Sequence, residues 1–231
     1  MIIIIGIAVF IVSFAISQKL KNKFKKYSQI PLSSGLSGKE VAQMMLRDNG
    51  IYDVEVVSVG GSLTDHYNPG NKSINLSQDV YYGRSAAAAA VAAHETGHAI
   101  QHATAYKALE VRSALVPLQN VSGQIINFIV IASIFGGAFL YNAFPMQLVL
   151  LVIIGAYAVI TLFSLITLPV EFDASKRALA WIDERGIVNN KEHGMAKDAL
   201  KWAAMTYLVA AIGSLVTLLY YIAIFMGVSR D

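Results

Sequence analysis

The sequence predicts a mainly α-helical integral membrane protein, with four spanning helices and a small cytoplasmic α+β region. Of its 231 residues, 55% are hydrophobic and only 14% are charged, whereas a soluble domain carries roughly 25% charged residues. Two long tracts, 113–170 and 202–229, contain no Asp, Glu, Lys or Arg. These observations exclude a soluble globular protein, a disordered chain and a fibrous repeat.

Two further features of the composition exclude other classes of protein. The formal net charge is only +3, and the basic residues are not interleaved with aromatic residues on a polar surface, so we expect no nucleic-acid partner. The chain contains no cysteine, which excludes disulfides, thiolate zinc sites and a cysteine nucleophile.

Four apolar segments form the expected membrane spans. Residues 2–17 lack a basic leading region and a small-residue cleavage site, so we expect a retained helix rather than a cleaved signal peptide. This run is short for a bilayer core of about 30 Å, but the lysines that follow it can snorkel. Residues 125–143 and 146–168 form two further spans, separated by Phe144-Pro145, and residues 207–228 form the fourth.

The basic residues predict the orientation of these spans. Of the 18 Lys and Arg residues, 11 lie between the first and second spans, 6 lie between the third and fourth, and one, Arg230, follows the fourth. The positive-inside rule therefore places both basic stretches in the cytoplasm and both termini outside. We interpret the lysines after the first span as a stop-transfer flank, with a lipid headgroup site as the alternative.

The polar stretch after the first span predicts a small α+β piece. Ser37 and Glu40 have the spacing of a capping box, which predicts a helix that ends at Asn49-Gly50. Residues 51–59 are rich in β-branched side chains and predict a strand. Two shorter strands, at 63–67 and 73–76, are expected on either side of the turn-forming run Asn68-Pro69-Gly70-Asn71.

A metal-binding motif lies in the helix expected from Ser85 onward. It reads His94-Glu95-Thr96-Gly97-His98, so the two histidines lie one turn apart on one face and can bind the same zinc ion. Glu95 projects about 100° away from His94, near the metal without binding it, where it can act as a general base toward water. The alternative is that these are ordinary residues of an alanine-rich helix.

A catalytic zinc site needs a third protein ligand. His102 lies two turns from His94, about 12 Å along the axis, which is too far for one ion on a straight helix. We favour Glu171, which follows the third span and Pro169 on the same side of the membrane. We expect Glu171 to lie at the start of a helix that Gly186 ends, because the dipole at a helix N-terminus favours a carboxylate. An ordinary first-turn acid is the alternative.

Two other residues are less direct candidates for a role near the metal. Asp173 is a candidate acceptor for the N–H of a zinc-bound imidazole, with a solvated first-turn acid as the alternative. His193 is interpreted as a surface histidine. No oxyanion donor is assigned; the available side chains are Tyr81, Tyr82, Arg84, His66, His102 and Arg177.

Several short motifs are spread over nearly the whole chain. They are Asp65-His66-Tyr67-Asn68-Pro69, Asn75-Leu76-Ser77, Gly83-Arg84-Ser85, the stretch 92–101 around the metal motif, Arg112-Ser113-Ala114-Leu115-Val116-Pro117, and Leu168-Pro169-Val170-Glu171-Phe172-Asp173-Ala174-Ser175. With these motifs, the chain resembles the bacterial membrane-bound neutral zinc metallopeptidase family. More distantly, the motifs resemble gluzincin membrane proteases of the heat-shock HtpX and CAAX prenyl protease type.

The resemblance implies a zinc site with defined roles. His94, His98 and Glu171 would be ligands, and Glu95 would be the general base. The gluzincin relatives carry Asp where this chain has Ser175, and that Asp orients a metal ligand, so the resemblance leaves open whether Asp173 takes over its task. These relatives also bind substrate as an added strand, for which residues 63–76 are a candidate edge; a plain structural hairpin is the alternative.

We therefore expect a zinc-dependent endopeptidase of the bacterial cell membrane. Its partners would be the lipid bilayer and a peptide or protein substrate, including membrane-associated substrates, and the sequence does not indicate an oligomeric state. The main alternative is a catalytically silent zinc-binding membrane scaffold, followed by another zinc hydrolase such as an amidase. A transporter or channel is disfavoured because the four spans lack the ionisable residues such proteins use.

The chain is predicted to have five parts. They are a transmembrane helix at 1–18, a cytoplasmic metallopeptidase region at 19–124, a transmembrane hairpin at 125–168, a cytoplasmic helical segment with the third ligand at 169–205, and a transmembrane helix at 206–228.

Overall fold

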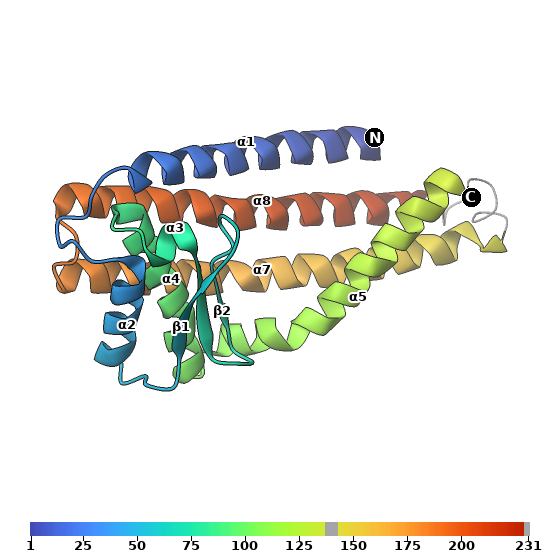
Figure 1. Cartoon of the computed structure of the whole chain (residues 1–231). Coiled ribbons are helices and arrows are strands. Elements are labelled where there is room, and N and C mark those ends of the chain that lie inside the picture. The colour runs from blue at the N-terminus through green and yellow to red at the C-terminus, as the bar shows by residue number, and fades with distance from the viewer. Residues whose placement is uncertain (137–142, 229–231) are drawn as a thin grey trace. The chain divides into compact units, whose positions relative to one another are not determined.

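The computed structural model describes residues 1–136 and 143–228, and these residues are mainly helical (Figure 1). The helices are α1 (Ile2–Ser28), α2 (Gly38–Asp48), α3 (Gln78–Tyr81), α4 (Ala86–Ala103), α5 (Lys107–Phe135), α7 (Met146–Glu184) and α8 (Asn190–Val228), and the strands are β1 (Glu55–Val59), β2 (His66–Asn68) and β3 (Ser73–Ser77).

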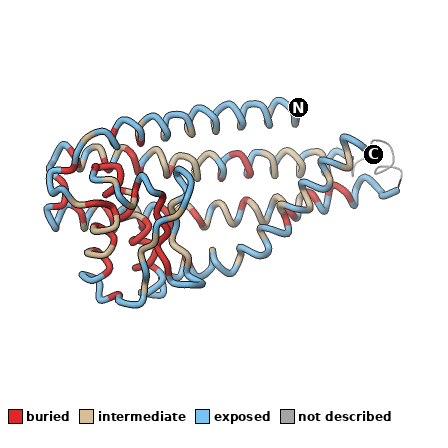
Figure 2. Tube along the Cα trace, in the orientation of Figure 1, coloured by how far each residue is buried: buried red, intermediate tan, exposed pale blue. Residues whose placement is uncertain are grey.

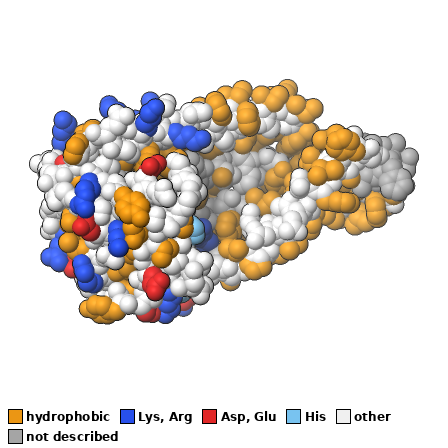
Figure 3. All heavy atoms as spheres, viewed as in Figure 1, with side chains coloured by type: hydrophobic (Ala, Val, Ile, Leu, Met, Phe, Trp, Pro, Cys, Tyr) orange, Lys and Arg blue, Asp and Glu red, His pale blue; other side chains and the backbone are white. Residues whose placement is uncertain are grey.

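The chain divides into two compact units. The first comprises Met1–Phe14, Val111–Leu168 and Tyr207–Asp231, and the second comprises Ala15–Glu110 and Pro169–Thr206. In the space-filling view, the visible Lys, Arg, Asp and Glu side chains lie mostly over the second unit, while apolar side chains cover much of the first (Figure 3). This contrast agrees with the predicted separation of apolar spans from a polar region.

The first unit is built from apolar helices. Among the described residues, four helices are long and apolar enough to cross a membrane, namely α1, α5, α7 and α8, which confirms the predicted fold class. Two of them approach closely, because a Cβ at Gly213 of α8 would lie 2.8 Å from a methyl carbon of Val9 in α1. Tyr157 of α7 and Tyr221 of α8 stack with ring centroids 5.8 Å apart.

The ends of these helices differ from the predicted spans. Helix α5 starts at Lys107, well before the span expected at 125–143, whose residues 137–142 lie outside the described part of the chain, as does Arg230. Helix α7 continues through Pro169 to Glu184, so the prediction that Glu171 opens a new helix is wrong. A proline removes one hydrogen bond and can kink a helix, but here the helix runs on through it.

The second unit contains a three-stranded sheet with the order β1-β3-β2. Strands β2 and β3 form the predicted antiparallel hairpin, in which Tyr67 lies opposite Ile74. Strand β1 pairs with β3 in parallel and is shorter than the predicted strand at 51–59. Strand β2 therefore forms one edge of the sheet.

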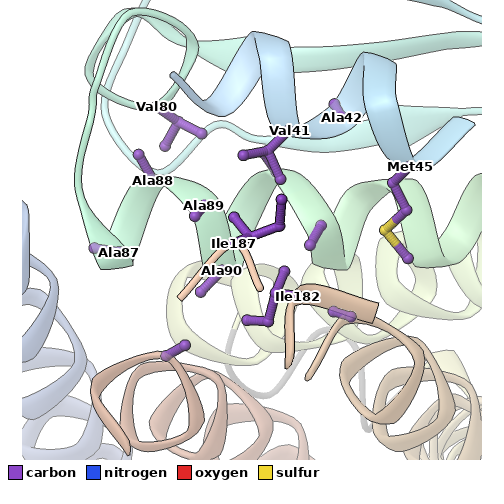
Figure 4. Close-up of a cluster of buried hydrophobic side chains, with 14 of the residues drawn as sticks. Val41, Ala42, Met45, Val80, Ala87, Ala88, Ala89, Ala90, Ile182 and Ile187 are labelled. Carbon is purple, nitrogen blue, oxygen red and sulfur yellow. The ribbon is translucent and has the colours of Figure 1, made fainter. Parts of the chain in front are cut away.

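The core of the second unit lies where α2, α4 and α7 meet, and the densest burial is in α4 and β3 (Figure 2). The predicted capping box starts α2, with both the Ser37 and the Glu40 hydrogen bonds present. Val41 and Met45 of α2 point toward the alanines of α4, and Ile182 of α7 packs on the same cluster (Figure 4). Because alanine side chains are small, they let α2 and α7 approach the α4 backbone closely.

Candidate metal centre

Helix α4 carries the paired histidines. Ser85 caps this helix, since its side chain accepts a hydrogen bond from the Ala88 backbone N–H, and residues 86–90 are at most 1% exposed. His94 and His98 lie one turn apart, with ring centroids 4.8 Å apart. The predicted pairing of the two imidazoles on one face is therefore present.

Helix α7 brings Glu171 to the two histidines. Its Oε2 atom lies 3.3 Å from Nε2 of His94 and 3.6 Å from Nε2 of His98. One ligand atom from each residue lies within 4.8 Å of the others, and among the described residues this is the group found suitable for a metal ion. Glu171 is only 2% exposed, so its carboxylate is held in the interior.

Gly97 allows this approach of α7 to α4. A Cβ at Gly97 would lie 2.7 Å from the carbonyl oxygen of Ala174 and 3.1 Å from its Cα. Any larger residue would push α7 away, because both obstructing atoms belong to the backbone. The glycine inside the metal motif therefore helps to set the distance between Glu171 and the histidines.

The Nδ1 atoms of both histidines are engaged by neighbouring side chains. Nδ1 of His94 lies 3.1 Å from Oγ of Ser175, and Nδ1 of His98 lies 3.0 Å from Oε1 of Gln101. When Nδ1–H donates these bonds, Nε2 keeps its lone pair for a metal. Ser175 thus contacts the histidine itself, although the resemblance left its task open.

The residues fit a zinc ion by the chemistry of their donor atoms. Two imidazole nitrogens and one carboxylate form a ligand set found in catalytic zinc sites, where a fourth position stays open. Burial lowers the pKa of His98, but its hydrogen bond to Glu171 and the charge of Glu95 outweigh burial and raise this pKa. The surroundings of His98 therefore favour positive charge, which a divalent cation also supplies.

Glu95 lies on α4 next to this group, and its carboxylate is held in place by the sheet. Oε2 accepts a hydrogen bond from the backbone N–H of Tyr67 at 3.0 Å, and the side chain is 9% exposed. Tyr67 lies in β2, the edge strand, so its N–H points away from β3. The outer edge of the sheet therefore runs beside Glu95.

Asp173 does not contact an imidazole directly. Its Oδ2 atom instead accepts hydrogen bonds from Nε2 of Gln101 at 2.9 Å and from Nε of Arg177 at 2.6 Å. The expectation of a direct bond between Asp173 and a ligand histidine is therefore corrected: Gln101 lies between Asp173 and His98. Its spacing of three residues from His98 on one helix was a signal for this contact.

His102 and His193 lie apart from the metal group. Nδ1 of His102 lies 2.8 Å from the hydroxyl of Tyr67, and His102 is exposed. Nδ1 of His193 lies 3.8 Å from Asp183. Neither histidine belongs to the group of possible ligands.

The side chains weighed as oxyanion donors do not converge on the centre as one set. Arg177 binds Asp173, Arg84 binds Glu40, and Nδ1 of His66 lies 2.8 Å from the Thr64 carbonyl oxygen. Tyr81 and Tyr82 form an edge-to-face pair with each other. No oxyanion donor is assigned.

Asp65 supports β2 in a way that the sequence did not reveal. Its Oδ1 atom accepts hydrogen bonds from the Ser77 backbone N–H at 2.7 Å and from the Ser77 hydroxyl at 3.0 Å. Burial raises the pKa of the Asp65 carboxyl, an effect that its bonds to Ser77 oppose. This contact joins the start of β2 to the end of β3.

Almost the entire chain matches a known family. Residues 2–226 match the family described as "putative neutral zinc metallopeptidase". The chain is 40% identical over 229 residues to the "putative membrane protease YugP" of Bacillus subtilis strain 168, an alignment that covers 99% of this chain and 98% of that protein. No solved structure matches it. With a ligand group suited to zinc and four candidate membrane helices, the protein belongs to the neutral zinc metallopeptidase family and is a membrane zinc metallopeptidase.

Proposed function

We propose that this metallopeptidase is an endopeptidase that cleaves peptide bonds at the cytoplasmic face of the membrane, with His94, His98 and Glu171 as zinc ligands. The convergence of the three ligand atoms within 4.8 Å carries this proposal. A zinc ion held there supplies a Lewis acid for the scissile carbonyl and lowers the pKa of water.

Glu95 is the general base in this proposal. Glu95 follows His94 in the sequence, and its carboxylate accepts a hydrogen bond from the N–H of Tyr67. The carboxylate is therefore held in place before substrate arrives. It accepts a proton from the attacking water and passes it to the leaving amine, as a positioned carboxylate can.

The outer edge of β2 is the proposed substrate platform. Strand β2 pairs with β3 on one side only, and the N–H of Tyr67 shows that its other side faces Glu95. An extended peptide bound along this edge would lie beside the general base. Because the Tyr67 N–H already binds Glu95, backbone hydrogen bonds to the peptide would come from the other backbone groups of this edge. Such recognition suits unfolded segments, including those near the membrane.

The length of α7 supports a metal centre outside the bilayer core, and the distribution of Lys and Arg supports the cytoplasmic side. Helix α7 has 39 residues, about 58 Å at 1.5 Å per residue, whereas about 20 residues cross the bilayer core. Its remaining turns, which contain Glu171, therefore extend beyond the core. Seventeen of the 18 Lys and Arg residues lie in the two stretches that we place on this side.

The substitution Glu95→Gln tests the catalytic role. We expect it to keep zinc bound and to lower cleavage of unfolded casein by at least about 100-fold, because an amide cannot take up the proton. The same exchange at exposed Glu110 is the matched control and should leave cleavage unchanged. Full proteolysis by Glu95→Gln would refute the assignment of Glu95 as the general base.

A further inference from the structure

The side chain of Gln101 is fully buried between the histidine helix and α7. It is 0% exposed, and each of its polar atoms has a partner. Oε1 lies 3.0 Å from Nδ1 of His98, while Nε2 lies 2.8 Å from the Val170 carbonyl oxygen and 2.9 Å from Oδ2 of Asp173.

These partners permit only one orientation of the amide. The Val170 carbonyl and the Asp173 carboxylate can only accept hydrogen bonds, so the NH₂ group of Gln101 must face them. The amide oxygen of Gln101 must then face His98. Because that oxygen can only accept, Nδ1 of His98 must carry the hydrogen, and in the neutral imidazole Nε2 then carries the lone pair.

Arg177 fixes the far end of this hydrogen-bond chain. Its Nε atom donates to Oδ2 of Asp173 at 2.6 Å, and its guanidinium lies over the ring of Tyr106, 6.0 Å from the centroid. All donors of this hydrogen-bond network therefore point toward Asp173. Arg177 donates to Asp173 from one side. Gln101 donates from the other side and itself accepts a hydrogen bond from His98.

We propose that Gln101 is a positioning residue that holds His98 in the tautomer able to bind zinc. This inference rests on the proposed function, in which His98 is a ligand. The same amide binds the Val170 carbonyl, next to Glu171, so it also couples the orientation of His98 to the docking of α7. His94 lacks such a constraint, because its neighbour Ser175 has a hydroxyl that can donate or accept.

The first test is the zinc affinity of the full-length protein in detergent, measured by competition with a chelator. Methionine is close to glutamine in size but has no amide, so Gln101→Met should weaken zinc binding about 10- to 100-fold. The same exchange at exposed Gln78 is the matched control and should leave affinity unchanged. Thermal unfolding of the metal-free variants reports whether the fold is kept.

The second test distinguishes a positioning role of Gln101 from a packing role by whether Asp173→Asn weakens or strengthens zinc binding. In the wild type, Asp173→Asn replaces the charged acceptor of the Gln101 amide with a neutral, weaker one and should weaken zinc binding. The exchange Gln101→Glu keeps an acceptor for His98 but places a carboxylate against Asp173, so in that background Asp173→Asn supplies a donor and should strengthen zinc binding. Losses that simply add in the double variant would overturn the inference.

The variant His98→Ala separates a failure of the proposed Gln101 role from a failure of the assignment of His98 as a zinc ligand. Loss of zinc in His98→Ala together with wild-type affinity in a folded Gln101→Met would overturn the role of Gln101 and leave the ligand assignment intact. Zinc bound at wild-type affinity by His98→Ala would overturn the ligand assignment, and with it the role of Gln101. Reversal of the Asp173→Asn effect, with zinc lost in His98→Ala, is the result that we expect.

Discussion

At the scale of single residues, the sequence predicts the candidate metal ligands of α4 better than the side chains that orient them. The spacing of His94 and His98 requires only helix geometry, so the sequence was sufficient to predict that they face one point. The contact between Ser175 and His94 depends on how α7 docks against α4, and so does the orientation of the Gln101 amide. Local sequence patterns do not encode this docking, so the role of Ser175 emerged only from the structure, and the spacing of Gln101 indicated only that it lies beside His98.

The contact between Ser175 and His94 yields a prediction at this scale. We expect Ser175→Ala to weaken zinc binding about 10-fold, because Nδ1–H of His94 loses its acceptor. Ser175→Asp should bind zinc at least as tightly as the wild type, because a carboxylate accepts this bond more strongly. Chelator competition measures both affinities.

A serine on the same helix provides the control for this prediction. The hydroxyl of Ser164 bonds to the Ile160 carbonyl within α7, so Ser164→Ala should not change zinc affinity. An unchanged affinity in Ser175→Ala would show that the hydroxyl does not orient His94.

At the scale of helices and strands, local signals predicted where several elements begin. The capping box at Ser37 and the turn at 68–71 correspond to α2 and to the β2–β3 hairpin. The continuous α7 was not predicted, because Pro169 followed by an acidic residue is also typical of a helix start. Glu171 therefore lies inside a helix and gains nothing from a helix N-terminus; α4 and α7 position it instead.

The crossing of α4 and α7 can be tested at Gly97. Gly97→Ala should destabilise the fold by about 1–3 kcal/mol through overpacking and should weaken zinc binding, because the new Cβ displaces α7 and Glu171. Gly194→Ala in α8 is the control, since a Cβ there meets nothing within 4 Å. That control should be neutral or stabilising by up to about 1 kcal/mol, because alanine favours helix.

Thermal unfolding and chelator competition on both glycine variants provide the readout. If Gly97→Ala bound zinc as tightly as the wild type, the close contact with Ala174 would not control the centre.

At the scale of the whole molecule, composition alone predicted four membrane helices and a polar remainder. The charge-free tracts were sufficient for this because apolar side chains in long runs are stable only in lipid or in a large core. The division between apolar and polar parts within α5 and α7 was harder to predict, since both helices continue past their apolar stretch. The sidedness of the membrane remains a prediction from the basic residues.

The absence of native cysteine allows a direct test of this orientation. A single cysteine at Tyr52, which is 81% exposed in the second unit, should react with an impermeant thiol reagent only when the cytoplasmic face is accessible. A single cysteine at Phe144, just before α7, should react with the same reagent when the cell wall has been removed and the plasma membrane is still intact. The opposite labelling pattern would invert the proposed topology and place the candidate centre outside the cell.

The most direct test of the central claim is the zinc content of the purified protein and of two variants. We expect one zinc per chain in the wild type and in His102→Ala, and a large loss of zinc in Glu171→Ala, because Glu171 contributes the carboxylate that faces both histidines. Zinc retained by Glu171→Ala but lost from His102→Ala would contradict the assignment of His94, His98 and Glu171 as the metal ligands.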